Sequence, residues 1–438
     1  MAKKIKKLSD KQKLRNFFQD VLSDARTEAP QCRHFGECGG CEFQDVPYPT
    51  QVEAKRKAFD FIAEEVMKDC RARAELLASG DEPDPEAAQT LLNRTSELEK
   101  ALAGVAIDTT PSPLPLGYRQ RMDYVFAFGM AGLRRANRHR QVVELAECPL
   151  LGDEGFAVFQ KAKALAVASN LESYDYLRHN GELRYFVVRR SRTGGILLSL
   201  VTKSHSPETA IMGILKRLVD DGDIVSGHWL LADGLGDVSF GQPLASVGQP
   251  WIIETMNGVE LRIGPNTFFQ SNPAVAEKAY AAIRDFTPEG GRVLDMYSGV
   301  ASIALSVAPR ARAVFAVENV PENVAVAEEN IRGNAAVNVR LLREDSSIHL
   351  KALADDSGAA RPDMVVVNPP RPGVEGDGMA SIKRLGPARL AYLSCNPFTL
   401  LRNISEIVDK YALRSLTIYD MFPQTRHFES LALLEKKG

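Results

Sequence analysis

The sequence predicts an α/β protein with a Rossmann-like domain in its carboxyl-terminal part and a β-rich region before it. From about Thr255 onward, short apolar runs alternate with segments of helical spacing, as in βαβ units. The apolar runs at 293–296, 364–367 and 390–394 end in polar residues followed by glycine or proline, which is typical of buried parallel strands. Between 118 and 203 short alternating runs indicate strands with one solvated face.

The composition is that of a soluble globular protein. The chain has 438 residues, 45% hydrophobic and 25% charged, which favours two or three domains. No apolar run approaches the ~18 residues that span a bilayer, and no apolar signal core follows the basic amino terminus. We therefore expect a cytoplasmic protein with no membrane contact, and a monomer. The net charge of −2 means that any nucleic-acid surface is a local patch.

The amino-terminal third divides into a tail and a cysteine-bearing region. Residues 1–30 form a basic tail, either a frayed solubilising helix or an arm that contacts phosphates. Residues 31–110 hold a glycine-rich loop with three cysteines and then a helical segment. From residue 51 to residue 104 we expect two polar, peripheral helices that carry no chemistry, with Cys70 a bystander.

Four cysteines form a candidate metal site. Cys32, Cys38 and Cys41 share the loop, and Cys148 follows in the next region. Four thiolates suit a tetrahedral zinc or an iron–sulfur cluster. The pattern favours [4Fe-4S], because three ligands are clustered, one is remote and a proline follows the last. Zinc and free thiols are the alternatives. His34 is not expected to be a ligand, because four cysteines fill the site.

Residues 111–255 are expected to form a β-rich central domain that binds RNA. Residues 118–140 carry six arginines against one aspartate, with Tyr118, Tyr124, Phe126 and Phe128 between them. Residues 184–203 repeat the pattern. Guanidinium groups can bind phosphates and rings can stack on unpaired bases, although a solvated strand face explains the pattern equally well.

The Rossmann-like part, residues 256–438, predicts a nucleoside cofactor. Asp295 and Gly299 follow its first strand, and Glu318 ends the second strand, where an acid can bind a ribose diol. The glycine pattern lacks the dinucleotide fingerprint, so S-adenosylmethionine fits better. Asp345, after the third strand, can meet the adenine amine, and Gln270 can present an amide to a ligand.

Further polar groups end the neighbouring strands. Cys395 and Asn368 follow the apolar runs at 390–394 and 364–367, so both are expected at the rim where open α/β sheets bind ligands. Glu429 begins the last strand and is expected at the same rim. The alternatives are a buried structural cysteine and a solvated surface acid.

Four motifs together resemble the RNA uracil-C5 methyltransferases. They are residues 268–273 (FFQSNP), 368–373 (NPPRPG), 393–397 (LSCNP) and 421–429 (MFPQTRHFE). The resemblance implies a catalytic S-adenosylmethionine-dependent methyltransferase domain, with Cys395 as nucleophile, Glu429 as base for the C5 proton, and Asn368 recognising uracil O4 and N3. It implies a [4Fe-4S] cluster on the four cysteines. It also implies that the cofactor is bound by Gln270, Asp295, Tyr297, Gly299, Glu318, Asp345 and Asn368.

The resemblance also bears on the substrate. Asn368 and the absence of a TRAM domain are similar to the branch that methylates uracil 747 of 23S rRNA, which is therefore the expected partner. The spacing of Cys32 and Cys38 instead resembles the uracil-1939 branch, and tRNA is a less favoured substrate. Ala301 stands where the family usually has glycine. The remote alternatives are an amino-methyltransferase and a non-catalytic RNA-binding or RNA-folding protein.

Overall fold

The computed structural model describes residues 8–80 and 82–438. Part of the expected basic tail, residues 1–7, therefore lies outside the described residues. Most of the remainder forms helix α1 (Asp10–Val21), which begins at a capping box formed by Ser9 and Gln12. Phe18 of α1 is buried, so this part of the tail is a packed helix.

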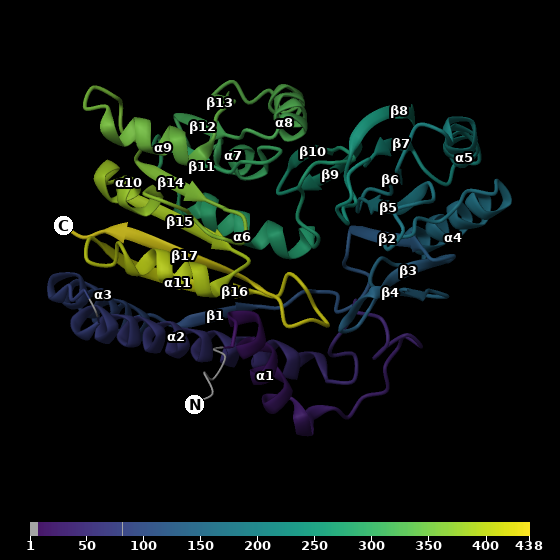
Figure 1. Cartoon of the computed structure of the whole chain (residues 1–438). Coiled ribbons are helices and arrows are strands. Elements are labelled where there is room, and N and C mark those ends of the chain that lie inside the picture. Colours follow the sequence, from purple (N-terminus) through teal and green to yellow (C-terminus); the bar gives the residue numbers. More distant parts are fainter. Residues whose placement is uncertain (1–7, 81) are drawn as a thin grey trace.

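Two large sheets, side by side in Figure 1, organise the described residues. The eight-stranded sheet has the order β1-β16-β17-β15-β14-β11-β12-β13, and the seven-stranded sheet has the order β4-β3-β2-β5-β6-β7-β8. Between them in sequence, β9 and β10 form a hairpin. The strands are β1 (Ile107–Thr110), β2 (Arg121–Ala127), β3 (Met130–Arg135), β4 (Arg138–Glu144), β5 (Leu183–Arg190), β6 (Ile196–Thr202), β7 (Ser226–Leu231), β8 (Gln242–Gly248), β9 (Ile252–Met256), β10 (Val259–Ile263), β11 (Arg292–Met296), β12 (Ala313–Val317), β13 (Val339–Leu342), β14 (Met364–Val367), β15 (Arg389–Ser394), β16 (Tyr411–Tyr419) and β17 (Glu429–Lys436).

The eight-stranded sheet is Rossmann-like, as the sequence predicts. Its strands run parallel except β17, which is antiparallel to both of its neighbours, β15 and β16. Successive side chains of a strand enter opposite faces, so Val293 joins one core cluster and Leu294 the other. The helices that follow these strands or precede them are α6 (Pro273–Phe286), α7 (Ser302–Val307), α8 (Pro321–Gly333), α9 (Ser346–Asp355), α10 (Gly378–Leu385) and α11 (Pro397–Ser405).

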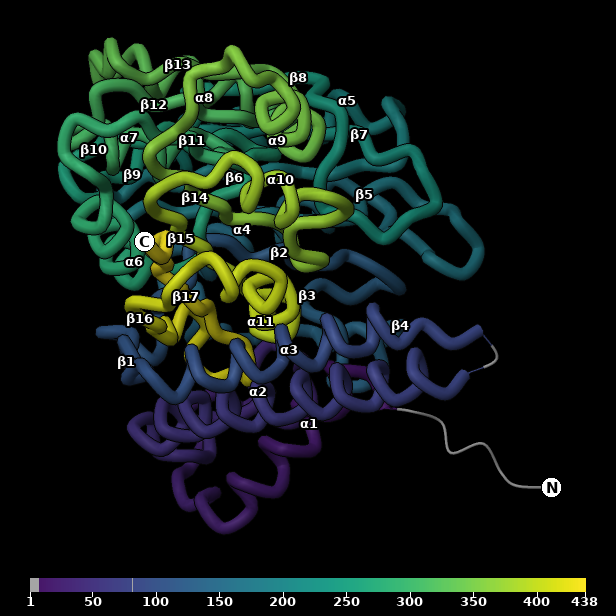
Figure 2. Tube along the Cα trace, turned by 90° about the vertical axis from the view of Figure 1, so that its left-hand side faces the viewer, coloured from purple at the N-terminus to yellow at the C-terminus, as the bar shows by residue number. Residues whose placement is uncertain are grey.

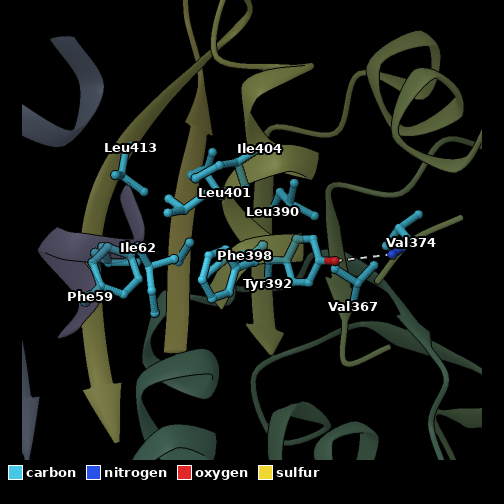
Figure 3. Close-up of a cluster of buried hydrophobic side chains, with 14 of the residues drawn as sticks. Phe59, Ile62, Val367, Val374, Leu390, Tyr392, Phe398, Leu401, Ile404 and Leu413 are labelled. Atoms are coloured by element: carbon cyan, nitrogen blue, oxygen red, sulfur yellow. Dashed lines mark hydrogen bonds between the residues drawn. The ribbon is translucent and has the colours of Figure 1, made fainter. Parts of the chain in front are cut away.

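The helical segment after the cysteine loop packs against this sheet. Helices α2 (Tyr48–Ser79) and α3 (Pro85–Ala103) run side by side along one edge of the molecule (Figure 2). Phe59 and Ile62 of α2 are fully buried in the same core as Phe398 and Leu401 of α11 (Figure 3). The expectation of peripheral helices is therefore wrong for α2, whose buried residues include the polar Gln51 and Lys55.

The expected region 31–110 is not separate from the carboxyl-terminal part. Strand β1, which follows α3, pairs in parallel with β16 and forms an edge of the eight-stranded sheet. A short edge strand pairs with a neighbour on one side only and buries few apolar side chains. Its sequence therefore shows little of the apolar pattern by which strands are predicted. The sequence pattern therefore gave no indication of β1.

The seven-stranded sheet carries α4 (Asp153–Ala168) and α5 (Glu208–Asp220) on one face. The ring of Tyr124 stacks on Phe159 of α4, with centroids 3.9 Å apart. Arg184 is fully buried and donates to the carbonyls of Ala232 and Gly234. The prediction that the aromatic residues of these strands stack on RNA bases is wrong for the rings that the core encloses, which are Tyr118, Tyr124, Phe126, Tyr185 and Phe186.

No helix in the described ranges 8–80 and 82–438 is long and apolar enough to cross a membrane.

Candidate active site

The sheet topology brings the predicted strand-end residues to one rim. Strand β11 lies between β12 and β14, and β14 lies beside β15, all in parallel. The carboxyl ends of these strands carry the turn at 297–299, Glu318, Asn368 and Cys395. From β11 the chain continues to β12 on one side of the strand, and it later returns to form β14 on the other side. Such a switch point in strand order is where open α/β sheets bind ligands.

Glu429 reaches the same rim because β17 is antiparallel. Ser430 of β17 pairs with Ser394, the last residue of β15, so the start of β17 meets the end of β15. Glu429 is buried, and among the described residues its Oε2 has no hydrogen-bond partner. Burial raises the pKa of Glu429 to about 8, and the Arg371 charge counteracts that rise.

Cys395 is half-buried beside Glu429 and Arg371. Burial raises the pKa of its thiol to about 11, and the negative charge of Glu429 adds to the rise, whereas the positive charge of Arg371 and a hydrogen bond from it lower the pKa. The Asn396 side chain donates to the Arg371 carbonyl over 3.0 Å. That bond joins the loop after β15 to the loop after β14. Cys395, Arg371 and Glu429 thus form one electrostatic unit next to the half-buried Asn368.

The turn after β11 adopts left-handed backbone conformations. Tyr297, Gly299 and Ala301 have φ angles of 59°, 56° and 64°, a region that strongly favours glycine. Ala301 is fully buried at the N-cap of α7. Because the φ of Ala301 is positive, glycine is favoured at this position, and an alanine there costs about 1–2 kcal/mol of conformational energy.

Glu318 holds this turn in place. Its Oε2 accepts a hydrogen bond from the Gly299 amide at 2.8 Å, and its Oε1 accepts from the amides of Asn319 and Val320 at 3.0 and 2.8 Å. The carboxylate is therefore oriented by three backbone amides. Asp345 is engaged similarly, since it caps α9 by accepting from the amide of Ser347 at 2.9 Å.

Asp295 and Gln270 lie beneath the rim. Asp295 is fully buried, and within the described part of the chain neither of its carboxyl oxygens has a hydrogen-bond partner. Burial raises the pKa of Asp295 to about 8. Gln270 is also buried, next to Tyr280, whose pKa burial raises to about 12 with smaller contributions from the charges of Asp295 and Glu429. An orphaned buried carboxyl is a polar group that a bound ligand can satisfy.

The four predicted cysteine ligands line one cavity. Cys32, Cys38, Cys41 and Cys148 surround it, and Leu133, Leu145 and Leu150 complete an apolar lining. His34 Nε2 instead accepts a hydrogen bond from the Ala146 amide at 2.9 Å. Across residues 8–80 and 82–438, however, no three His, Cys, Asp or Glu side chains stand in an arrangement that holds a metal ion.

Comparison with known proteins identifies the family. Residues 255–437 match the model of the tRNA (uracil-5-)-methyltransferase family. An uncharacterized RNA methyltransferase of Nitratidesulfovibrio vulgaris is 30% identical over 427 residues, which cover 93% of this chain and 83% of the relative. The chain belongs to the RNA uracil-C5 methyltransferases.

A match in sequence and a match in structure agree with this family. The tRNA (uracil(54)-C(5))-methyltransferase of Pyrococcus abyssi is 26% identical over 422 residues, covering 94% of this chain and 88% of that protein. The crystal structure of that organism's tRNA (uracil-54, C5)-methyltransferase in complex with S-adenosyl-L-homocysteine has a TM-score of 0.69, with 26% identity. The match covers 90% of this chain and 85% of the other. The catalytic fold predicted for the methyltransferase is confirmed.

A groove of ≈ 640 Å³ with a net basic lining runs from the cysteine-bearing loop to residues 425–427, which precede Glu429 in the chain. Arginines expected from the sequence to face RNA lie along it, together with groups from the amino-terminal helix and the segment before Glu429. Phe240, 58% exposed, also lines the groove, and sequence analysis missed it because a lone phenylalanine in an irregular stretch carries no periodic signal. The basic side chains of the lining are Lys11, Arg119, Arg134, Arg135 and Arg426, and its acidic side chains are Glu42, Asp123 and Asp237.

Proposed function

We propose that this enzyme methylates C5 of a specific uridine in 23S rRNA, position 747, through a covalent bond between Cys395 and uracil C6. The observation that carries the covalent mechanism is the proximity of Cys395 to the buried Glu429 at the ends of adjacent strands, and the choice of position 747 rests on the family resemblance. Uracil C5 is a poor nucleophile, and a thiolate at C6 turns the ring into an enolate that can attack a methyl donor. S-adenosylmethionine supplies that methyl group on a sulfonium.

Each catalytic side chain then has one task. The Cys395 thiol loses its proton to solvent, and the thiolate adds to C6, with Arg371 favouring the charged form. C5 takes the methyl group. Glu429 accepts the C5 proton, the C6–sulfur bond breaks, and the thiolate of Cys395 is restored. A buried carboxylate with a pKa of about 8 is a stronger base than an exposed one, and the ionised fraction that can take the proton grows until the pH passes that value.

Asn368 is proposed to recognise the base. Negative charge builds on O4 in the enolate, and the Asn368 amide can donate to O4 while its oxygen accepts from N3–H. Cytosine presents the opposite pattern of donor and acceptor, so the same contacts reject it. An asparagine at this position is therefore compatible with catalysis on uracil.

The proposed cofactor site combines the turn after β11 with its neighbours. The orphaned Asp295 carboxyl lies next to that turn and suits a cationic group of the ligand. Glu318, oriented by the turn, is proposed to bind the ribose, and Asp345 the adenine amine. The remaining proposed contacts with S-adenosylmethionine are Gln270, Tyr297, Gly299 and Asn368.

We also propose that Cys32, Cys38, Cys41 and Cys148 hold a [4Fe-4S] cluster. The support is their shared apolar cavity and the family resemblance. Four thiolates are the ligand set that such a cluster needs, and a zinc ion is the alternative. Methyl transfer requires no electron, so the cysteines act by fixing the loop that borders the basic groove.

A second substrate has specific support. The Pyrococcus abyssi relative is named for uracil 54 of tRNA, so tRNA is the alternative, beside uracil 1939 of 23S rRNA. In either case the target base is expected to be splayed out of a loop rather than read within a helix.

Methyl transfer from labelled S-adenosylmethionine tests the proposal. The substrates are unmodified transcripts of the 747 and 1939 loops of 23S rRNA and a tRNA, with Cys395→Ala beside wild type and Cys70→Ala as the matched cysteine control. Label found as 5-methyluridine in the 747 loop, absent only with Cys395→Ala, is the expected result. Label in another RNA overturns the substrate, and methylation by Cys395→Ala overturns the mechanism.

A further inference from the structure

The 420–428 segment connects β16 to β17 and ends directly before Glu429. It is not an exposed loop. Asp420, Gln424 and Thr425 are all buried, and the segment is contacted by α2, by the cysteine loop (residues 32–46) and by Tyr118, whose hydroxyl donates to the Pro423 carbonyl. The path by which the chain enters β17 is therefore fixed by regions distant in sequence.

Helix α2 holds the beginning of this segment. Lys55 Nζ lies 2.5 Å from Asp420 Oδ1 and also donates to the Phe422 carbonyl at 2.9 Å. The Lys55 and Asp420 side chains are both fully buried. The Tyr48 hydroxyl donates to the second oxygen of Asp420 at 2.9 Å. A buried ion pair of this kind adds little net stability, but it fixes one geometry, because breaking it leaves an uncompensated buried charge.

The middle of the segment is held in a strained conformation. Gln424 has a φ of 66°, which is uncommon for a residue other than glycine. Its amide donates to Gln51 Oε1 at 3.1 Å, and its carbonyl accepts from the Glu42 amide at 2.7 Å. Backbone strain of this type persists where the surroundings over-determine it, and it clusters at functional sites.

The same contacts tie the segment to the cysteine loop. Gln51 Nε2 donates to the carbonyls of Phe43 and Val46, both at 2.9 Å, so a single buried side chain contacts both regions. Arg426 Nη1 lies 2.5 Å from Glu42 Oε2. Glu42 directly follows Cys41, so a proposed cluster ligand is adjacent in sequence to a residue that holds the 420–428 segment.

We propose that Gln51 and Lys55 are positioning residues for the removal of the C5 proton: Lys55 fixes the 420–428 segment to α2, Gln51 fixes it to the cysteine loop, and together they place Glu429 over the base. This inference rests on the proposed role of Glu429. It assigns a function to α2, which contacts the Rossmann-like sheet but contributes no group to the rim.

The chemistry predicts a specific defect when the contacts of Gln51 and Lys55 with the 420–428 segment are removed. Addition of the Cys395 thiolate at C6 and attack by C5 on the methyl group need no base at C5. Release of the product does, because the C5 proton must leave before the C6–sulfur bond can break. A misplaced Glu429 therefore leaves methylated RNA covalently attached to the enzyme, whereas a general loss of structure slows addition as well.

The test compares turnover with covalent capture. Lys55→Met combined with Asp420→Asn removes both buried charges together, so neither is left unpaired, and Gln51→Leu removes the link to the cysteine loop. Lys57→Met is the control, because its side chain is 58% exposed on the same helix. The RNA is the transcript that wild type methylates, used unmodified and with 5-fluorouridine at the target. Adducts are measured on denaturing gels.

The expected result is a roughly tenfold to hundredfold fall in turnover, a covalent adduct that accumulates on unmodified RNA, and adduct formation on the fluorinated RNA close to the wild-type rate. Variants that behave like Lys57→Met, or that lose adduct formation and turnover together while folded, overturn the inference. If these variants do not fold, Glu42→Ala, at a partly exposed side chain, is decisive by the same two readouts. Wild type that forms no adduct with fluorinated RNA instead overturns the proposed function.

Discussion

Replacing Glu429 with glutamine is predicted to stabilise the protein at neutral pH while abolishing product release. In the folded protein the pKa of this carboxyl is about 8, against 4.5 for the free group. At pH 7 the unfolded chain is ionised at this position and the folded one is mostly protonated. Each pH unit above 4.5 costs the folded state about 1.4 kcal/mol, or about 3 kcal/mol by pH 7.

Glutamine is neutral in both states, so Glu429→Gln recovers this energy. The gain is absent below pH 4.5, where glutamate is protonated whether folded or not, and it grows until the pH reaches about 8. Urea unfolding followed by circular dichroism at pH 4 and pH 7 measures it. Glu260→Gln, at an exposed carboxyl on β10, is the control and should change neither value. A gain that is the same at both pH values, or no gain, would refute the assignment of a desolvated, unpaired Glu429.

Four further predictions follow from the same geometry. Product release should rise about tenfold per pH unit below pH 8 and level off above it, because Glu429 must be ionised; a flat profile in single-turnover release would contradict this. Arg371→Met should slow adduct formation with 5-fluorouridine RNA at pH 7 by up to about tenfold, and less at high pH, because the pKa of Cys395 rises. Asn368→Ala should lower turnover by roughly 10²–10³ with RNA binding retained in filter assays, through loss of the O4 donor. Cys148→Ser should lose bound iron and the visible absorption of a cluster, whereas Cys70→Ser should keep both.

The strand-end residues could be predicted from sequence because the signal is local. An apolar run that stops at a cysteine, an asparagine or an acid marks a strand and its rim in the same few residues. Cys395, Asn368 and Glu318 lie where such runs end, and the parallel sheet then brings them together without further information.

What the sequence could not provide depends on long-range contacts. The rings of Tyr124 and Phe186 stand in stretches rich in arginine, which suggests exposed strand faces, yet α4 and α5 cover them. Lys55 looks like one more surface charge on a polar helix. Its burial follows from a partner, Asp420, that lies at the other end of the chain. No periodicity within α2 reports on that partner.

The position of Glu429 explains why the 420–428 segment is packed so closely. In the proposed mechanism a base must reach the same rim as Cys395, and only a strand of reversed direction can begin where β15 ends, so β17 enters the sheet antiparallel. The connecting segment, which is buried at Asp420, Gln424 and Thr425, then leads directly into Glu429. If water penetrated there, the pKa of Glu429 would fall towards 4.5 and the carboxylate would become a weaker base. By our proposal, the buried contacts of Gln51 and Lys55 keep water out of that segment. Burial of Glu429 thus both lowers the stability of the folded protein and makes the carboxylate a stronger base. A variant that lets water reach the 420–428 segment should therefore reduce the destabilisation and the base strength together.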